Sequence, residues 1–329
     1  MNRRIVLKSR PQGMPTPENF ELVEAPVPEP KEGELLIKHD YIGIVPAARL
    51  RMSEGPSYAP STLVGEAVYG QAVGTVVKSR HENFKPGDVA MTLSGGWQEY
   101  SIGQGKVLTK VDTTVAPKSL WLGAFGTSGF TAYVGILKIA RLQPSDTVVV
   151  SASTGAVGSV AGQIAKLHGC KVVGIAGGQQ KCEIAVGEYG FDACIDYRAT
   201  DFPRQLAAAT PNGIDVYFEN VGGAVRDAVW PLMNQAGRVA VCGLISEYND
   251  GKGPGPGWFN VLTKRLSVTG FIVSDHEELR EEFYRSMARW FAEGRVRVRE
   301  DVTQGLENAP SAFIGMLNGK NLGKTVVKV

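Results

Sequence analysis

Hydrophobic and polar positions follow two different patterns along the chain, and the change comes near residue 120. Before it, short alternating runs such as residues 34–38 and 74–78 are separated by turn sequences such as Phe84-Lys85-Pro86-Gly87-Asp88, which is typical of a compact β domain. After it, apolar runs alternate with helical segments, the arrangement that buries a parallel sheet between two helical layers. The pattern therefore predicts an α/β protein with two domains.

Six apolar runs in the second part are predicted to form one doubly wound sheet. Several consist of β-branched residues with little polar alternation, as strands buried on both faces require. Helices are predicted at residues 156–168 and from residue 274 or 275 to Gly294, and the apolar stripe of the later helix should pack on the sheet. This stripe is Leu279, Phe283, Met287 and Trp290, and the strands are residues 147–152, 171–176, 193–196, 214–218, 238–242 and 266–273.

The chain returns to strand-like patterns after Gly294. Residues 295–299 alternate arginine with valine as an edge strand would, and residues 324–329 form another strand pattern. Because this tail has the same strand-like pattern as the first part of the chain, we expect it to belong to the same domain as that part. The expected domains are residues 1–120 with 300–329, and residues 121–299.

Length and charge narrow the class of protein. A chain of 329 residues is about twice the length of a typical domain of ~150 residues, in keeping with two domains. The formal charge of +2 and the scattered basic residues argue against nucleic acid as a partner. Glycine and hydroxyl residues interrupt the uncharged windows 119–137 and 147–165, so we interpret them as buried segments and expect no membrane association. No secretion signal pattern opens the chain, and we expect a cytoplasmic protein.

The cysteines and histidines do not form a metal-binding pattern. The four cysteines, of which Cys170 is the first, include no Cys-x-x-Cys pair, which zinc ribbons and dithiol redox sites usually need. The first domain has no cysteine, and no ligand cluster surrounds its two histidines, His39 and His81. A catalytic zinc ion requires such ligands, so we predict a site without metal.

A glycine turn follows the first strand of the second domain. Residues 147–152 lead into Ser153-Thr154-Gly155-Ala156-Val157-Gly158, and a predicted helix follows. In a dinucleotide-binding turn, the middle glycine lets the backbone approach the pyrophosphate and the last lets the helix pack close to the strand. Gly155 and Gly158 occupy these places, but Ser153 stands where the first glycine would. The motif predicts nucleotide binding, with a merely structural turn as the alternative.

The end of the second strand indicates which dinucleotide to expect. An NAD enzyme carries a carboxylate there, about 20 residues after the turn, for the ribose 2′-hydroxyl. This chain has Ala176-Gly177-Gly178-Gln179-Gln180-Lys181, with no acid to repel a 2′-phosphate and with Lys181 within reach of one. The sequence favours NADP(H); the alternative is that Lys181 is a solvated residue of the first helical turn.

Two further glycine-containing stretches end strands at the carboxyl edge of the predicted sheet, where open α/β sheets bind ligands. They are Glu219-Asn220-Val221-Gly222-Gly223 and Cys242-Gly243-Leu244-Ile245-Ser246-Glu247-Tyr248. The glycines permit close approach to a ligand, and the second stretch adds a phenol. A plain turn is the alternative for each.

Seven motifs along nearly the whole chain resemble one known family. They are Arg51-Met52-Ser53, Pro56-Ser57-Tyr58, Phe84-Lys85-Pro86-Gly87-Asp88, Gly155-Ala156-Val157-Gly158-Ser159, Asn220-Val221-Gly222-Gly223, Gly270-Phe271-Ile272-Val273 and Asn321-Leu322-Gly323-Lys324. Together they resemble the zinc-free medium-chain dehydrogenase/reductase branch that contains prostaglandin reductases, alkenal double-bond reductases and bacterial curcumin reductase.

This resemblance implies a GroES-like β domain, a Rossmann domain with a six-stranded parallel sheet, NADP(H) as cofactor, and a homodimer. It implies that Gly155, Ala156, Val157 and Gly158 cradle the pyrophosphate. Lys181 and Tyr197 would hold the 2′-phosphate, and Thr131 matches a position near the nicotinamide. The rest of the cofactor would be lined by Asn220, Cys242, Gly243, Leu244, Ile245, Ser246, Tyr248, Phe271, Ile272, Val273 and Asn321.

The branch reduces the carbon–carbon double bond of enones and enals. Hydride is delivered to the β-carbon, negative charge develops on the carbonyl oxygen, and a proton then reaches the α-carbon. Without a metal, hydrogen-bond donors must stabilise that charge, each contributing about 3–4 kcal/mol when well placed. Tyr248 is the first candidate for such a catalytic donor, and the alternative is that it only packs against the cofactor.

One stretch departs from the family's pattern. Where the family usually has Asp-Pro-Tyr-Met-Arg, this chain has Val45-Pro46-Ala47-Ala48-Arg49. We therefore expect a roomier substrate pocket beside Ala47 and Ala48, with Arg49 and Tyr58 as pocket residues. Arg49 is equally interpretable as a structural ion-pair partner.

Two other functions stay open at this point. The chain could be an NADPH:quinone oxidoreductase, which uses the same hydride donor without zinc, or a non-catalytic NADPH-binding protein of the crystallin or sensor kind. The expected partner is a small enone, enal or quinone.

Overall fold

The computed structural model describes residues 1–55, 57–249, 255 and 257–329. Pro56 of the motif Pro56-Ser57-Tyr58 lies outside the described residues. The chain divides into two compact units, which we call unit 1 (Met1–Gly123 with Glu300–Val329) and unit 2 (Ala124–Arg299).

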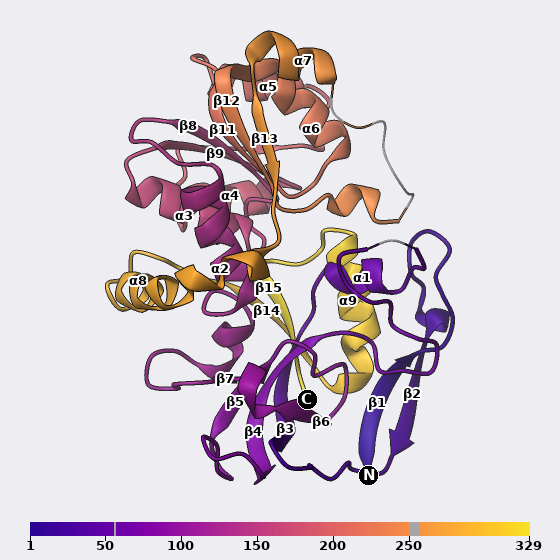
Figure 1. Cartoon of the computed structure of the whole chain (residues 1–329). Coiled ribbons are helices and arrows are strands. Elements are labelled where there is room, and N and C mark those ends of the chain that lie inside the picture. The colour runs from indigo at the N-terminus through magenta and orange to yellow at the C-terminus, as the bar shows by residue number, and fades with distance from the viewer. Residues whose placement is uncertain (56, 250–254, 256) are drawn as a thin grey trace. The chain divides into compact units, whose positions relative to one another are not determined.

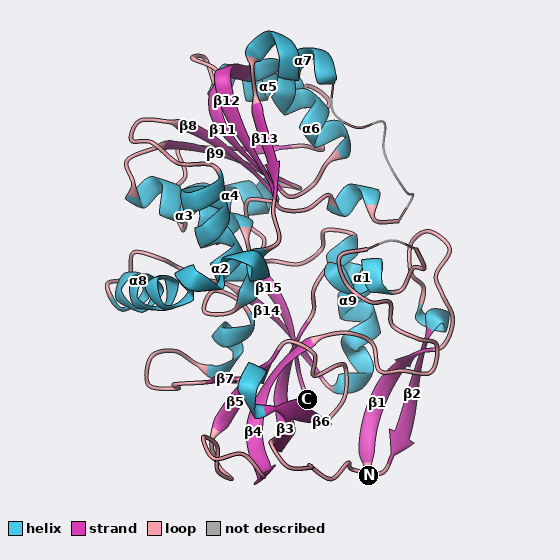
Figure 2. Cartoon of the chain, in the orientation of Figure 1, coloured by secondary structure: helices cyan, strands magenta, loops and turns pink. Residues whose placement is uncertain are grey.

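Unit 1 consists mainly of strands (Figure 2). In its larger sheet, β3 pairs antiparallel with β4, β6 and β15, so the last strand of the chain is bonded directly to the N-terminal part. β14 pairs parallel with β15. The strands are β1 (Asn2–Leu7), β2 (Phe20–Ala25), β3 (Glu34–Gly43), β4 (Gln71–Ser79), β5 (Val89–Thr92), β6 (Tyr100–Gln104), β7 (Thr109–Lys110), β14 (Glu300–Gln304) and β15 (Lys324–Lys328); the helices are α1 (Ala47–Arg51) and α9 (Ala309–Leu317).

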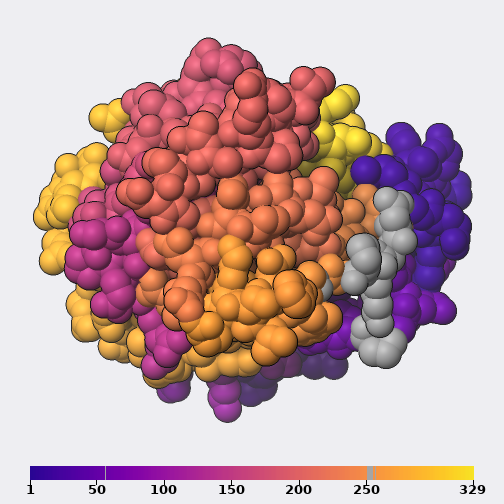
Figure 3. Space-filling model, turned by 90° about the horizontal axis from the view of Figure 1, so that it is seen from above, coloured from indigo at the N-terminus to yellow at the C-terminus, as the bar shows by residue number. Residues whose placement is uncertain are grey.

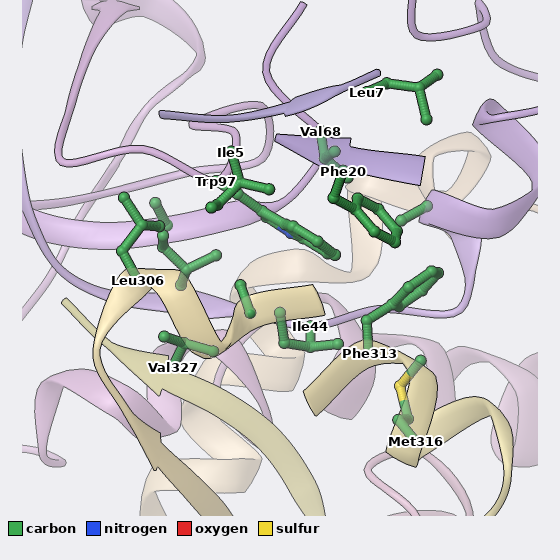
Figure 4. Packing of buried hydrophobic residues seen from close by; sticks show 14 of the residues in the cluster. Ile5, Leu7, Phe20, Ile44, Val68, Trp97, Leu306, Phe313, Met316 and Val327 are labelled. Carbon is green, nitrogen blue, oxygen red and sulfur yellow. The ribbon is translucent and has the colours of Figure 1, made fainter. Parts of the chain in front are cut away.

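Aromatic side chains from distant parts of the sequence form the core of unit 1 (Figure 4). The ring of Trp97 lies 5.7 Å from that of Phe20 and 5.4 Å from that of Phe313 on α9, measured between centroids. Burying a side chain of this size stabilises the fold by roughly 1.5–3 kcal/mol. The C-terminal tail is therefore part of the core of this unit.

Unit 2 is built on a parallel sheet in the order β10-β9-β8-β11-β12-β13, and its six strands in the described part of the chain confirm the predicted doubly wound sheet. Segments far apart in sequence, coloured magenta to orange, share its surface (Figure 3). The strands are β8 (Thr147–Ser151), β9 (Lys171–Ala176), β10 (Ala193–Asp196), β11 (Ile214–Glu219), β12 (Met233–Val241) and β13 (Ser267–Gly270); the helices are α2 (Thr127–Tyr133), α3 (Gly158–Leu167), α4 (Gln179–Gly187), α5 (Phe202–Ala209), α6 (Gly223–Val229), α7 (Trp258–Lys264) and α8 (Arg280–Ala292).

The strand order places the candidate site. β8 and β11 are neighbours in the middle of the sheet, and the chain proceeds outward from them in opposite directions. Because all six described strands are parallel, their carboxyl ends share one edge (Figure 1). Open α/β sheets bind ligands at that edge, where the strand order reverses.

Two predictions about elements of unit 2 are wrong. Residues 295–299 are not a strand, because the backbone of Arg297 bonds to the side chain of Gln163 through both its N–H and its carbonyl. The ring contacts of the predicted stripe are with helical segments rather than with a strand: Phe283 lies beside Phe130 and Tyr133 of α2, and Trp290 lies beside Tyr133 and His168, which follows α3. Leu279 lies in the 3-10 helix η7 (Val273–Leu279), just before α8. No helix in the described ranges has both the length and the apolar character needed to span a bilayer.

Candidate functional site

The turn between β8 and α3 leaves open space at one glycine and none at the other. A Cβ placed on Gly155 would have only the Ala152 carbonyl oxygen within 4 Å, at 3.2 Å. A Cβ on Gly158 would clash with that same oxygen and lie 3.0 Å from the carbonyl carbon. Gly158 thus allows α3 to pack close to the strand, while Gly155 keeps the outer side of the turn accessible at a helix N-terminus, where backbone N–H groups attract anions.

The turn also holds one residue in an unfavourable conformation. Ala152 has a φ of +49°, in the left-handed region that costs a residue with a Cβ about 1–2 kcal/mol. Its carbonyl accepts a hydrogen bond from the Gly155 N–H at 2.9 Å, and the Ser153 N–H donates to Ile175 on β9 at 3.0 Å. The turn is therefore anchored to the neighbouring strand.

Lys181 and Tyr197, predicted as a pair, lie in the segments that follow the neighbouring strands β9 and β10. A Cβ on Gly177 would meet the Tyr197 ring at 2.8 Å, so this ring needs a glycine beneath it. Lys181 lies in the first turn of α4, which begins after Gly178. Arg198, which sequence reasoning missed, lies next to Gly178, 3.9 Å from where a Cβ would be.

An acid that sequence reasoning also missed lies here. The carboxylate of Asp196, the last residue of β10, accepts hydrogen bonds from the N–H groups of Gly178 and Arg198, both at 2.9 Å. Sequence reasoning looked for such an acid only at the end of β9, because a sequence does not show which strands are neighbours in the sheet. Asp196 holds the turn that leads from β9 into α4.

The two predicted glycine-containing stretches lie side by side after β11 and β12. The N–H of Gly243 donates to the carbonyl of Glu219 at 3.1 Å. Ser246 donates to the Val221 carbonyl through its N–H at 3.0 Å and its hydroxyl at 2.6 Å. The structure thus brings Asn220 and residues 242–248 together at the carboxyl edge of the sheet.

A buried carboxylate positions the first of these stretches. Oε1 of Glu219 accepts hydrogen bonds from the N–H groups of Val221 at 2.8 Å and Gly222 at 3.0 Å, and from the Ser151 hydroxyl at 3.1 Å. Burial raises the pKa of Glu219, while the backbone donors oppose that rise. The only sequence signal for this role is an acid that ends an apolar strand.

An ion pair between a buried arginine and a half-buried glutamate positions the second stretch. Oε1 of Glu247 accepts hydrogen bonds from Nη1 of Arg226 at 2.7 Å and from the N–H of Gly223 at 3.1 Å. The Arg226 side chain is almost fully buried on α6. Sequence reasoning included Glu247 only as part of its stretch and missed Arg226 and the ion pair, since a charged pair 21 residues apart has no local signal.

Tyr248 lies over its own loop. Its phenol oxygen accepts a hydrogen bond from the Leu244 N–H at 3.4 Å and would lie 3.2 Å from a Cβ on Gly243. The side-chain amide of Asn220 donates to the Ser151 carbonyl at 2.7 Å. Both side chains are therefore held at the edge formed by β8, β11 and β12.

Residues 271–273 directly follow β13 at this edge, and Thr131 also belongs to unit 2. Thr131 belongs to α2, which continues into a π-helix, η4 (Val134–Ile139). A Cβ on Gly135 of this π-helix would clash with the rings of Phe218 and Phe271, at 2.6 and 2.7 Å. Phe271 and Val273 are half-buried, and Ile272 is exposed.

The other predicted site residues belong to unit 1. Arg49 is 3% exposed and donates to Ser53 Oγ at 2.8 Å and to the Gly13 carbonyl at 2.9 Å, contacts that tie α1 to the N-terminal segment. Tyr58 is 60% exposed. The side chain of Asn321 donates to the Gly323 carbonyl at 2.8 Å.

The alanine pair in α1 corrects one expectation. Ala48 is buried in the core of unit 1, whereas Ala47 is half-buried. Consecutive residues of a helix point about 100° apart, so the two positions do not share a wall. The expectation that both alanines widen a pocket is therefore wrong for Ala48.

The described residues do not fit a metal site. Nowhere in the described ranges do three or more His, Cys, Asp or Glu residues form a group that could hold a metal ion. Both ring nitrogens of His39 are hydrogen-bonded, to the Gln98 carbonyl and to Ser101 Oγ, each at 2.7 Å. Burial lowers the pKa of His39 to about 4, so its ring is neutral at pH 7.

Two family models match the chain. One is described as the N-terminal domain of oxidoreductase and covers residues 3–111; the other is described as zinc-binding dehydrogenase and covers residues 156–293. Two curated relatives are similar over nearly their whole length. NADPH-dependent curcumin reductase of Escherichia coli (strain K12) is 48% identical, covering 100% of this chain and 97% of the relative. Prostaglandin reductase 1 of Sus scrofa is 41% identical, covering 98% and 97%.

A solved structure is also similar throughout. The crystal structure of CurA in complex with NADPH from Vibrio vulnificus superposes with a TM-score of 0.94 at 46% identity, covering 99% of each chain.

Proposed function

Because the chain belongs to the medium-chain dehydrogenase/reductase family, we propose that it is an NADPH-dependent reductase of the carbon–carbon double bond of α,β-unsaturated ketones or aldehydes. The similarity to an NADPH-dependent curcumin reductase over the full chain supports the cofactor and the substrate class. The expected partner is therefore a small enone or enal.

The observation that carries this proposal is the open side of the turn at Gly155. In this turn the backbone can approach a pyrophosphate, because only one carbonyl oxygen lies within 4 Å of the missing Cβ. In the segments that follow β9 and β10, Lys181 and Tyr197 would supply a cation and a phenol for a 2′-phosphate, and Arg198 would add a second cation beside Gly178. These residues fit a phosphorylated dinucleotide.

The cofactor, when bound, supplies the hydride that adds to the β-carbon of the substrate. The protein's own task is then to hold the reactants, to exclude water and to stabilise negative charge on the substrate's carbonyl oxygen. A hydrogen-bond donor aimed at that oxygen lowers the activation free energy by roughly 3–4 kcal/mol. We assign this role to the phenol of Tyr248, whose loop is fixed by hydrogen bonds to residues 219–221.

The remaining predicted residues are proposed to line the two ends of the site. Thr131 is proposed to lie near the nicotinamide, and Asn220 and residues 242–248 and 271–273 to line the rest of the cofactor. The carboxyl edge of the sheet that Asn220 and these two stretches share supports this assignment. Tyr58, with its exposed side chain, is proposed to contact substrate.

A substrate panel tests the proposal. NADPH oxidation should be measured with enones and enals graded by size, with the corresponding saturated ketones as matched controls, and with quinones in a separate arm. Turnover of the alkenes, with the saturated product identified by mass, is expected. Turnover of quinones alone would support the quinone reductase alternative, and tight NADPH binding without any turnover would support a non-catalytic role.

A further inference from the structure

In the described part of unit 1, an arginine without an acidic partner lies on a phenol ring. Cζ of Arg51, the last residue of α1, lies 3.8 Å from the centroid of the Tyr69 ring. No described residue forms an ion pair or a hydrogen bond with the Arg51 side chain, and its Nε is buried without a partner. A ring face offsets only part of the cost of desolvating a cation. Arg51 therefore keeps the capacity to donate hydrogen bonds to an anion.

The two other arginines near α1 differ, because their donors are used within the protein. Arg49 donates to a hydroxyl group and to a backbone carbonyl. Arg10 forms an ion pair with Glu54 at 2.8 Å and donates to two backbone carbonyls. These two side chains hold segments of unit 1 together, whereas Arg51 makes no such contact with a described residue.

Tyr69 places a second donor beside this cation. Its side chain packs against the core cluster of unit 1. Burial raises the pKa of Tyr69; the Arg51 guanidinium opposes that rise and Tyr58 adds to it. The phenol therefore keeps its proton at neutral pH, and its hydroxyl has no hydrogen-bond partner among the described residues. A guanidinium and a neutral phenol side by side present the N–H and O–H donors that bind a carboxylate.

The pair adjoins the residues proposed to line the substrate pocket, and this part rests on the proposed function. Ala47 precedes Arg51 by four residues on α1, so the two side chains share one face of the helix, and both are half-buried. The loop that contains Tyr58 returns to α1, where the N–H of Thr62 donates to the Arg51 carbonyl at 2.7 Å. Arg51 therefore lies at the base of the loop that is proposed to contact substrate.

We propose that Arg51 and Tyr69 form a binding subsite for a carboxylate, so that the preferred substrate is an enone or enal that also carries an acid group. The planar guanidinium of Arg51 and the hydroxyl of Tyr69 donate to the carboxylate oxygens. No bond of the substrate breaks at this subsite, so it stabilises the bound substrate and the transition state alike. KM should therefore depend on the subsite, whereas kcat should not.

A carboxylic acid and its methyl ester test the subsite in the wild-type protein. An enone with a terminal carboxylate is compared with its methyl ester, which has the same enone and the same chain but no charge. With NADPH at pH 7, we expect the KM of the acid to lie below that of the ester by about tenfold or more, the scale of one charge-assisted hydrogen bond. Equal KM values for acid and ester would overturn the proposal.

Substitutions then locate the preference. Arg51→Met should abolish the difference between acid and ester, and Arg51→Lys, which keeps the charge without the planar fork, should restore part of it. Tyr69→Phe keeps the ring beneath Arg51 and should reduce the difference. Arg80→Met is the matched control, because it removes the charge of an exposed arginine in the same unit and should keep the preference. A general loss of activity would affect acid and ester alike, so an unchanged ratio in Arg51→Met would overturn the subsite.

A pair of ligands that cannot react separates the subsite from the proposed function. The saturated keto acid and its methyl ester are titrated by calorimetry into the protein in the presence of NADP⁺. The acid should bind more tightly by about tenfold or more, and Arg51→Met should remove this advantage. Equal affinity, or binding of neither, would overturn the subsite. Turnover of neither enone, together with tighter binding of the keto acid, would instead refute the proposed function and leave the subsite supported.

Discussion

Replacing each glycine of the turn by alanine should separate cofactor binding from stability. In Gly155→Ala, the methyl group meets only the Ala152 carbonyl oxygen, at 3.2 Å, so a shift of a few tenths of an ångström accommodates it. The unfolding free energy should change by less than about 1 kcal/mol, since the loss of chain entropy in the unfolded state offsets part of the contact. The methyl group nevertheless occupies the side of the turn that a pyrophosphate must approach. NADPH affinity should therefore fall by tenfold or more, which is about 1.4 kcal/mol.

Gly158→Ala should behave in the opposite way. Its methyl group would overlap backbone atoms of Ala152, which cannot rotate away as a side chain can, so α3 must move off the sheet. Overpacking of this kind costs about 1–3 kcal/mol. Gly187→Ala is the matched control, because that glycine is also helical and a methyl group added to it would have no atom within 4 Å.

Thermal unfolding without ligand and NADPH titration by fluorescence provide the two measurements for all three variants. The expected pattern is weaker binding with nearly normal stability for Gly155→Ala, reduced stability for Gly158→Ala, and neither effect for Gly187→Ala. If Gly155→Ala binds NADPH as tightly as the wild type, then the open side of the turn is not the pyrophosphate site, and the assignment of the cofactor site fails.

Three other substitutions address charge and chemistry. Lys181→Ala should raise the KM for NADPH and leave that for NADH nearly unchanged; an equal loss with both cofactors would contradict a 2′-phosphate contact. Tyr248→Phe should lower kcat on the order of 10²–10³-fold. An unchanged rate constant of hydride transfer in single-turnover assays would exclude the phenol from the chemistry. Burial lowers the pKa of Lys324 to about 7 from an ordinary 10.5. The unfolded chain then binds more protons between these values, so this lysine's contribution to stability rises with pH across that window. Denaturant unfolding at pH 6.5 to 9.5 should show that rise in the wild type relative to Lys324→Met; parallel curves would refute it.

The sheet of unit 2 was predictable because buried parallel strands leave long apolar runs in the sequence. β8, β9 and β10 begin where the pattern placed them. The interpretation of residues 295–299 as a strand failed, because alternation alone does not reveal which partner satisfies the backbone. Here Gln163, more than 130 residues away, provides both hydrogen bonds for Arg297.

The candidate site was predictable only where a local motif accompanies the chemistry. The glycine turn and Lys181 have such signals. Arg226 and Glu247 do not, since they bond to groups that the fold brings beside them. Glu219 has only the weak signal of an acid that ends an apolar strand.

The serine in place of the first motif glycine can be explained by the neighbouring strand. Ser153 is fully buried, and its hydroxyl lies 2.7 Å from where a Cβ on Gly174 would be. A side chain at residue 174 would therefore exclude the one at residue 153. The tight approach that normally requires a glycine in the turn is achieved here by a glycine in β9, because the turn and the strand share a single small space. The side chain that the motif leaves out at residue 153 is therefore left out at residue 174 of β9 instead. The turn thus keeps the backbone path that Gly155 and Gly158 need.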